Sequence, residues 1–270
     1  MTNINPKFPH GEAQQYIEAM LRPVHDAGKL AKRRFFTDVR VSEQADFDCI
    51  VDEVNLACEK LIIKGIRCID GSHPIHSAKS AVSGGTADWS WIVDPLDGTH
   101  NYLSAIPLFG VTLTLCHLDE PVAAILYDAY QDEMVHGIRN GPIFHNQVPL
   151  RELSTGQSLK HSTIGWMQGH AMRDDPLARQ IREIVERHSK RLLATWSPVI
   201  DTIKIATGRF GGTVSFDGAS TDVSAAQVII PALGGKVVRF SRDGADRGFI
   251  IGASQHVAEL SGHIQQAISR

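Results

Sequence analysis

Residues 91–102, WIVDPLDGTHNY, are the stretch of this sequence that says most about its fold and chemistry. An apolar strand is predicted to lead into Asp94, and Pro95 and Gly98 are typical of the tight turn that follows such a strand. Asp94 and Asp97, three residues apart at the end of a strand, can point toward one cation, and Mg²⁺ prefers hard oxygen ligands of this kind. The stretch therefore predicts a strand and turn that carry a cation site.

The turn is also a candidate phosphate site. Thr99 and Asn101 suit the start of a helix, and the backbone N–H groups of Gly98 and Thr99 are then placed to receive a phosphate oxygen. Phosphoryl chemistry requires a cation site beside an anion site. The same residues also fit a plain turn and a plain helix cap, so this stretch alone leaves both interpretations open.

Outward from this stretch, apolar periodicity predicts helices before it, a run of strands after it, and then alternating helices and strands. The expected helices are 11–34, 52–64, 175–188, 199–207, 222–233 and 254–269, with Pro23 bending the first helix or marking its start. The expected strands are 89–93, 110–117, 122–127, 133–137, 212–216, 236–240 and 249–251. This order predicts a layered α/β sandwich. We expect one domain over residues 1–270, with halves of about 1–150 and 151–270 packed together.

Composition excludes several classes of partner. The chain has 270 residues, 43% of them hydrophobic and 21% charged, with a net charge of −3 and no block of like charges. This balance favours neither a nucleic acid nor a membrane as partner. We expect no signal peptide in the polar residues 1–10, and no apolar run approaches the roughly 20 residues that span a bilayer. The four cysteines are scattered, which favours reduced thiols in a cytoplasmic protein.

A second stretch, residues 220–235 (STDVSAAQVIIPALGG), places Asp222 at the expected start of an apolar helix that paired glycines end. Taken alone, Asp222 fits a simple helix cap. Taken together, the two stretches resemble the two signatures of the inositol monophosphatase family. The residues that fall on the DPxDGTxN signature are Asp94, Asp97, Gly98, Thr99 and Asn101, and those on the WDxxA…GG signature are Asp222, Val223, Ala225, Gly234 and Gly235. Thr221 stands where the family usually has Trp.

The resemblance extends over roughly residues 15–260. Residues 51–59, VDEVNLACE, resemble the family's VTEADxxAE helix, residues 110–154 follow its strand series, and Gly208–Arg209 match its glycine–basic pair. It implies a five-layer αβαβα sandwich, commonly a homodimer, that uses Mg²⁺ to hydrolyse a small phosphorylated metabolite.

The resemblance also implies roles for individual residues. Asp94 would bridge two metals, Asp97 and Asp222 would complete the metal on the leaving-group side, and the carbonyl of Leu96 would be a further ligand. Gly98 and Thr99 would hold the phosphate, and the Thr99 hydroxyl would orient the attacking water.

The sequence departs from the family on the side of the attacking water. The family's Gly-Glu-Glu motif is replaced by PIHSAKS at 74–80, with Ser77 or Ala78 at the position of the metal-binding Glu, and no glutamate occurs between Lys60 and Asp119. Asn55 replaces the Asp that would activate the water. Asp52, turned inward, is our candidate for a substitute catalytic carboxylate. His73 and His76 offer other ligands, although exposed loop positions are the simpler expectation for both.

The substrate side differs as well. Ser215 stands where inositol-specific members have a Glu that grips a ring hydroxyl, so we do not expect inositol phosphate as the substrate. Residues 161–170 are expected to shape the substrate mouth, and Trp166 and Trp196 fit either core packing or substrate stacking.

Three hypotheses follow. The first is a divergent Mg²⁺-dependent phosphatase that acts on a sugar, cyclitol or nucleotide phosphate. The second is a catalytically impaired family member that binds a phosphate ligand or a protein. The third is a lyase or isomerase that uses the same pocket.

Overall fold

A computed structural model describes residues 8–39, 47–77, 81–82, 87–154, 158–172, 174–218 and 220–268. The helices within these ranges are α1 (His10–Arg34), α2 (Phe47–Ile69), α3 (Thr99–Leu103), α4 (Pro176–His188), α5 (Pro198–Ala206), α6 (Ala226–Ala232) and α7 (Ser254–Ile268). Shorter helical segments are η1 (Phe35–Val39), η2 (Leu159–His161), η3 (His170–Met172) and η4 (Ser220–Val223).

The strands form two sheets. The first sheet, in the order β2-β1-β3-β4-β5-β6-β7-β8, contains β1 (Ile75–Ser77), β2 (Ala81–Val82), β3 (Trp89–Asp97), β4 (Gly110–His117), β5 (Glu120–Asp128), β6 (Glu133–Ile138), β7 (Ile143–His145) and β8 (Val148–Pro149). The second sheet, in the order β10-β9-β11-β13-β12, contains β9 (Thr163–Gln168), β10 (Arg191–Leu193), β11 (Gly212–Phe216), β12 (Lys236–Arg242) and β13 (Ala245–Gly252).

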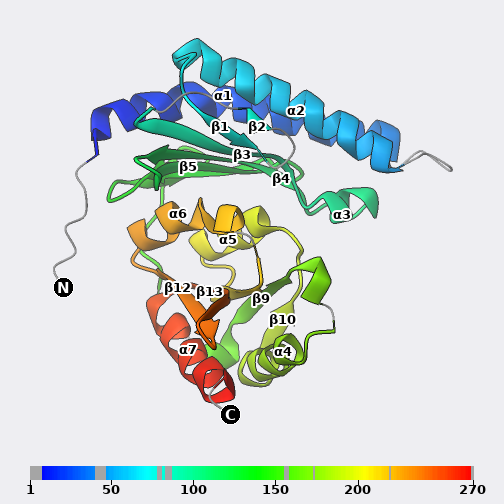
Figure 1. Cartoon of the computed structure of the whole chain (residues 1–270), viewed down its shortest axis with the longest axis vertical. Coiled ribbons are helices and arrows are strands. Elements are labelled where there is room, and N and C mark those ends of the chain that lie inside the picture. The colour runs from blue at the N-terminus through cyan, green and yellow to red at the C-terminus, as the bar shows by residue number, and fades with distance from the viewer. Residues whose placement is uncertain are drawn as a thin grey trace.

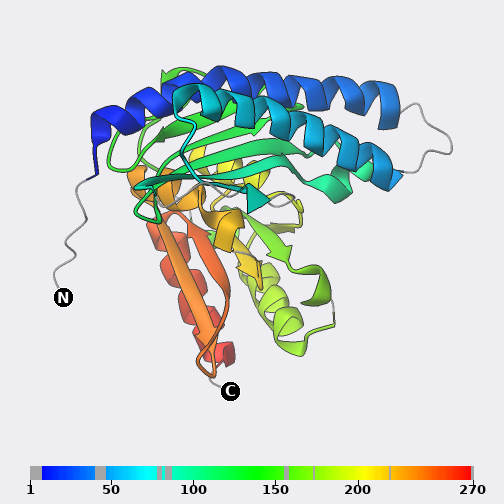
Figure 2. The ribbon, with the colours of Figure 1, turned by 45° about the horizontal axis from the view of Figure 1, so that its top comes forward.

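The elements stack in five layers, α-β-α-β-α, as the family resemblance implies (Figure 1). Helices α1 and α2 cover the outer face of the first sheet, and α5 and α6 lie between the two sheets. Helices α4 and α7 pack on the outer face of the second sheet, as the turned view also shows (Figure 2). Both faces of each sheet are thereby covered by helices, and the large hydrophobic cores of the described chain lie between these layers.

Helix α1 shows how the apolar pattern becomes structure. Ile17, Met20, Val24 and Ala31 recur at helical spacing and are all fully buried against the first sheet. Pro23 lies inside α1, so it does not mark the start of the helix.

Some boundaries differ from the prediction. Helix α2 begins at Phe47 and ends at Ile69, longer at both ends than the expected 52–64. Six of the described strands were not anticipated: β1, β2, β7, β8, β9 and β10. Each has six residues or fewer, and periodicity in so short a run does not distinguish a strand from a loop or a helical segment. The expected end of the last helix at Ser269 lies outside the described residues. The division into two packed halves stays a prediction.

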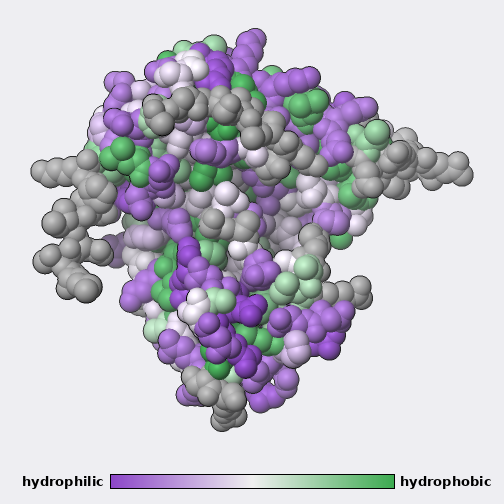
Figure 3. Space-filling view, in the orientation of Figure 1, coloured by the Kyte–Doolittle hydropathy of each residue, from purple (hydrophilic) through white to green (hydrophobic). Residues whose placement is uncertain are grey.

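The surface and the cysteines add few special features. On the face in Figure 3, hydrophobic residues are scattered among hydrophilic ones over the described part of the chain. Within the same ranges no helix is long and apolar enough to cross a membrane. The four cysteines are free thiols, with Cys58 and Cys116 buried and Cys49 and Cys68 exposed.

Candidate active site

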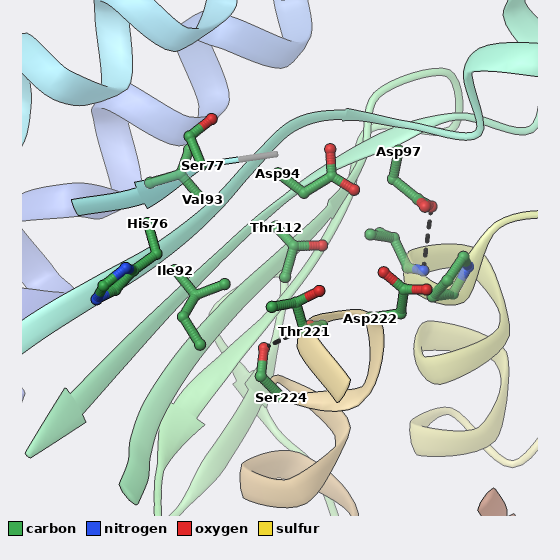
Figure 4. Close-up of a pocket in the computed structure, with 12 residues that line it drawn as sticks. His76, Ser77, Ile92, Val93, Asp94, Asp97, Thr112, Thr221, Asp222 and Ser224 are labelled. Atoms are coloured by element: carbon green, nitrogen blue, oxygen red, sulfur yellow. Dashed lines mark hydrogen bonds between the residues drawn. The ribbon is translucent and has the colours of Figure 1, made fainter. Parts of the chain in front are cut away.

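A pocket of about 130 Å³ lies between the first sheet and the middle helical layer (Figure 4). It brings together the three aspartates on which the sequence argument rests, Asp94, Asp97 and Asp222. Figure 4 shows their carboxylates facing the same space from β3 and from the η4 turn. The other lining residues are His76, Ser77, Ile92, Val93, Thr112, Pro198, Val199, Thr221 and Ser224.

The end of β3 places two of these carboxylates by breaking its own regular pairing. Asp94 is opposite Thr112 on β4, whereas Asp97 is opposite Gly110, so the register shifts between the two aspartates. Pro95 has no N–H to donate to the ladder, and an irregularity is the normal consequence inside a sheet. The Leu96 N–H donates instead to Asp94 Oδ1 at 3.2 Å, which fixes the first carboxylate.

Gly98 makes the turn that follows. Its φ of +74° lies in the left-handed region, which glycine adopts without steric cost. Helix α3 then begins at Thr99, as predicted, and the Asn101 side-chain amide donates to the carbonyls of Leu108 at 2.8 Å and Thr195 at 2.7 Å. This amide ties the turn to the chain just before α5. Gly98 and Thr99 are adjacent to Asp97 but are not among the residues that line the pocket.

Asp97 is held from the other side by the start of α5. Its Oδ2 accepts hydrogen bonds from the Ser197 hydroxyl and, at 3.1 Å, from the Val199 N–H. Ser197 is also the N-cap of α5, where its hydroxyl accepts from the Ile200 N–H at 3.3 Å. A helix N-terminus favours negative charge, so α5 both orients and stabilises the Asp97 carboxylate.

Asp222 is reached differently from the prediction. It lies in the short η4 turn, Ser220–Val223, and α6 begins only at Ala226, so Asp222 is not at the start of the apolar helix. The Ser224 hydroxyl donates to the Thr221 carbonyl at 2.8 Å, and this local bond competes with helical pairing. The turn brings Asp222 to the pocket beside the β3 carboxylates.

The electrostatics of the pocket reflect a crowding of negative charge. Burial, followed by the charge of Asp222, raises the pKa of Asp94 to about 6, although the Leu96 N–H opposes the shift. Burial, and then the Asp94 charge, raises the pKa of Asp97 well above its usual range. Asp94 is only partly accessible, through the pocket itself. Such a cluster is relieved by a proton or by a cation.

This crowding predicts a pH dependence of stability. A carboxyl whose pKa is raised on folding takes up a proton, so its ionisation destabilises the folded protein as pH rises from about 4 through about 6. With a chelator present, Asp94→Asn should therefore gain stability relative to the wild type as pH rises from about 4 to about 6, and the gain should level off at higher pH. Urea unfolding at several pH values measures this difference. Buried histidines with lowered pKa, such as His73 and His136, have the opposite dependence but cancel in the comparison. A constant difference across this range would contradict the prediction.

A carboxylate, that of Glu59, lies next to Ser77 on the side of the pocket where the sequence predicts that the family's carboxylates are missing. The Ser77 hydroxyl donates to Glu59 Oε1, and Glu59 is a buried residue of α2 that sequence reasoning missed. Figure 4 shows the Ser77 hydroxyl turned away from the three aspartates. Asn55, one turn earlier on α2, is also buried, and its Oδ1 has no hydrogen-bond partner among the described residues. Ala78 lies outside the described residues.

The other predicted residues of this side are distributed unevenly. Asp52 is exposed on α2 and does not line the pocket, so its catalytic role stays a prediction. The expectation of exposed loop positions is wrong for His73, which is 3% exposed and accepts a hydrogen bond from Trp91 Nε1 at 3.2 Å. His76 is exposed as expected, but it belongs to strand β1 and lines the pocket.

The carboxylates of the pocket are the type of ligand that a hard divalent cation prefers, but they do not lie close enough together to form a complete metal site. The pocket is lined by three carboxylates and by no lysine or arginine of the described chain. Within the described ranges, however, no three His, Cys, Asp or Glu side chains are grouped closely enough to hold a metal ion.

Comparison with known proteins agrees with this architecture. The model of the inositol monophosphatase family matches residues 12–269. A probable inositol 1-monophosphatase of Mycobacterium tuberculosis, ImpA, is 29% identical over 188 residues, which are 68% of this chain and 69% of that protein. Inositol monophosphatase 1 of Solanum lycopersicum is 27% identical over 267 residues, which are 96% and 94% of the two chains.

The fold has close structural counterparts. The crystal structure of the extragenic suppressor protein suhB from Bartonella henselae superposes with a TM-score of 0.80 at 20% identity, covering 93% of this chain and 98% of that one. The αβαβα fold is therefore confirmed. With the family model matching nearly the whole chain, this protein belongs to the inositol monophosphatase family.

Proposed function

We propose that this protein is a divergent Mg²⁺-dependent phosphatase that hydrolyses a small phosphomonoester with a metal-activated water. The observation that supports this most strongly is the convergence of Asp94, Asp97 and Asp222 on one pocket beside the Gly98 turn. Family membership supports a phosphatase, and members of the family are generally metal-dependent. The identity of the metal and of the substrate class belong to the proposal.

The proposed metal site uses oxygen donors only. Asp94, Asp97 and Asp222 would hold Mg²⁺, with the Leu96 carbonyl as a further ligand, because Mg²⁺ takes carboxylates and carbonyls and keeps several waters. When bound, Mg²⁺ supplies Lewis-acid stabilisation of the negative charge that develops on the phosphoryl and leaving oxygens. The raised pKa values of Asp94 and Asp97 show that negative charge in this pocket is unfavourable without a counter-ion, and this fits a site that a bound cation would stabilise.

The chain positions the reacting groups. Ser197 and the Val199 N–H hold Asp97 through one oxygen and leave its other oxygen for the pocket. The N–H groups of Gly98 and Thr99 would receive the phosphate, and the Thr99 hydroxyl would orient the water. Since water must lose a proton as it attacks, a nearby proton acceptor is needed, and Asp52 is the candidate on α2. The amide oxygen of Asn55, which has no hydrogen-bond partner among the described residues, could accept a hydrogen bond from the water but not its proton.

The charge on the nucleophile side is smaller than the family pattern implies but is not absent. The segment 74–80 that replaces the family's Gly-Glu-Glu motif has no acidic residue, but Glu59 of α2 places a carboxylate next to Ser77 of that segment. A hydroxyl that donates to a carboxylate keeps its lone pairs for another donor. We therefore expect reduced activity rather than none.

The test is inorganic phosphate release from a panel of sugar, cyclitol and nucleotide monophosphates, with Mg²⁺ and with EDTA. Magnesium-dependent release from at least one ester is the expected result. Consumption of substrate without phosphate release would favour the lyase or isomerase alternative. If no ester in the panel releases phosphate or is consumed, the result would favour a catalytically impaired family member that binds a phosphate ligand or a protein.

Two further parts of the proposal concern the whole molecule. We propose a cytoplasmic homodimer, with no nucleic acid or membrane partner. The free thiols of Cys49 and Cys68 fit a reducing compartment. Sedimentation equilibrium with and without Mg²⁺ should give twice the chain mass of 29.6 kDa, and a monomer at micromolar concentration would contradict this part alone.

A further inference from the structure

A second cavity continues the carboxylate pocket toward the second sheet. It has a volume of about 190 Å³, and it shares Asp222 and Pro198 with the first pocket. Its other lining residues are Met167, Gln168, Gly169, Trp196, Ser215, Asp217 and Gly218. A phosphate held near Asp222 would therefore direct the rest of its ester into this cavity.

Trp196 is fixed in this cavity by residues that cannot move freely. Thr195 is buried, donates from Oγ1 to Asp201 at 2.5 Å, and accepts at its carbonyl from the Asn101 amide at 2.7 Å. Ser197 is fully buried and donates to Asp97. Trp196 stands between these two anchored residues, so its backbone position follows from the architecture of the carboxylate site.

The conformation of Trp196 is costly. Its φ of +54° lies in the left-handed region, which bulky residues rarely adopt. The side chain is 38% exposed, although indole is among the groups that gain most from burial. Unfavourable backbone geometry concentrates at ligand sites, where the surrounding structure enforces it. Trp166, the other tryptophan at this sheet, is 1% exposed and donates from Nε1 to Gln168, so it is a packing residue.

The rest of the cavity has narrow backbone walls and two aspartates, Asp217 and Asp222, so it suits a flat group without further negative charge. Gly169 and Gly218 bring bare backbone to its walls, where an added Cβ would lie 2.9 Å from the Asp217 carbonyl and 2.3 Å from Ser215 Oγ. Ser215 offers a neutral hydroxyl, and no lysine or arginine of the described chain lines the cavity. A second phosphate would find no positive partner here.

We propose that Trp196 is a stacking platform that selects phosphomonoesters whose alcohol carries an aromatic ring, with nucleoside monophosphates as the biological class. This rests on the proposed phosphatase function for the chemical step, but the stacking itself is a binding property. Stacking on an aromatic side chain tolerates any base, because every base presents a π-face.

Adenosine 5'-monophosphate and ribose 5-phosphate form a matched pair of probes, because the sugar phosphate has a hydroxyl group where the nucleotide has its base. The wild type should have a higher kcat/KM for the nucleotide. Trp196→Gly removes the ring and suits the backbone conformation, and it should lower kcat/KM for the nucleotide roughly 5- to 100-fold more than kcat/KM for ribose 5-phosphate. Trp196→Phe should retain most of the preference. An equal fall for both esters, or no preference in the wild type, would overturn the proposal.

Tryptophan fluorescence separates this proposal from the phosphatase function. If neither ester releases phosphate, nucleotide binding in the presence of Mg²⁺ still decides. Quenching by adenosine 5'-monophosphate but not by ribose 5-phosphate, and its loss in Trp196→Phe, would support the platform without hydrolysis. Equal signals from both ligands, or quenching in Trp196→Phe that is as strong as in the wild type, would refute it.

Discussion

Asp97→Asn should lower kcat/KM for phosphate release by about 10³-fold, because it removes about 4 kcal/mol of metal-dependent transition-state stabilisation. The substitution keeps the side-chain shape, so an oxygen remains to accept from Ser197 and Val199. It removes one of three charges in a pocket where burial and Asp94 already raise the pKa of Asp97. The folded protein should therefore be at least as stable without metal, while its affinity for Mg²⁺ falls.

A second variant tests the hydrogen bonds that hold the Asp97 carboxylate, separately from its charge. Ser197→Ala leaves the carboxylate but removes one of its two donors and the side-chain cap of α5, so we expect a smaller loss, about 10-fold. Asp243→Asn is the control, because that side chain is 90% exposed in the β12–β13 turn. Steady-state kinetics measures kcat/KM for phosphate release, and titration calorimetry measures the affinity for Mg²⁺. Wild-type kinetics in Asp97→Asn would contradict the proposed role of this carboxylate.

Gly98→Ala should destabilise the protein by about 2–4 kcal/mol and disturb the phosphate turn. A side chain at φ +74° costs about 1–2 kcal/mol on conformational grounds. The added Cβ would also lie 2.5 Å from the Leu108 carbonyl oxygen, which is backbone and cannot rotate away. Relief of this contact must move the turn that connects Asp97 with α3.

Gly208→Ala is the matched control for this prediction. Gly208 has nearly the same φ, +72°, but an added Cβ would have nothing within 4 Å among the described residues. It should therefore show the conformational cost alone, about 1 kcal/mol, with unchanged activity. Urea unfolding gives the free energies, and phosphate release gives the activity. Equal destabilisation of the two variants would show that the contact with Leu108 has no effect.

Local pattern in the sequence predicted a layered α/β fold and the strand and turn around Asp94, and the family resemblance implied the five layers. The apolar run before Asp94, the Pro95–Gly98 turn and the helix start at Thr99 all occur within twelve residues, so little long-range information was needed. The resemblance grouped Asp222 with Asp94 and Asp97, and the three line one pocket, although the η4 turn stands where a helix start was expected.

What could not be predicted depends on contacts between distant segments. Glu59 and Ser77 are 18 residues apart, and only the packing of α2 against the first sheet brings a carboxylate behind the depleted wall. The sequence did not distinguish Trp166 from Trp196, since each fits either core packing or substrate stacking. Only the structure shows that Trp166 is buried and Trp196 exposed. His73 was misjudged because its hydrogen bond to Trp91 removes the cost of burying an imidazole.

The most direct test of the central claim, a water attacking phosphorus in the Asp94–Asp97–Asp222 pocket, is hydrolysis in H₂¹⁸O with Mg²⁺. The released phosphate of the best ester in the panel should carry one ¹⁸O, and the alcohol product should carry none. Unlabelled phosphate with a labelled or unsaturated alcohol product would mean that a carbon–oxygen bond breaks, and it would contradict the account.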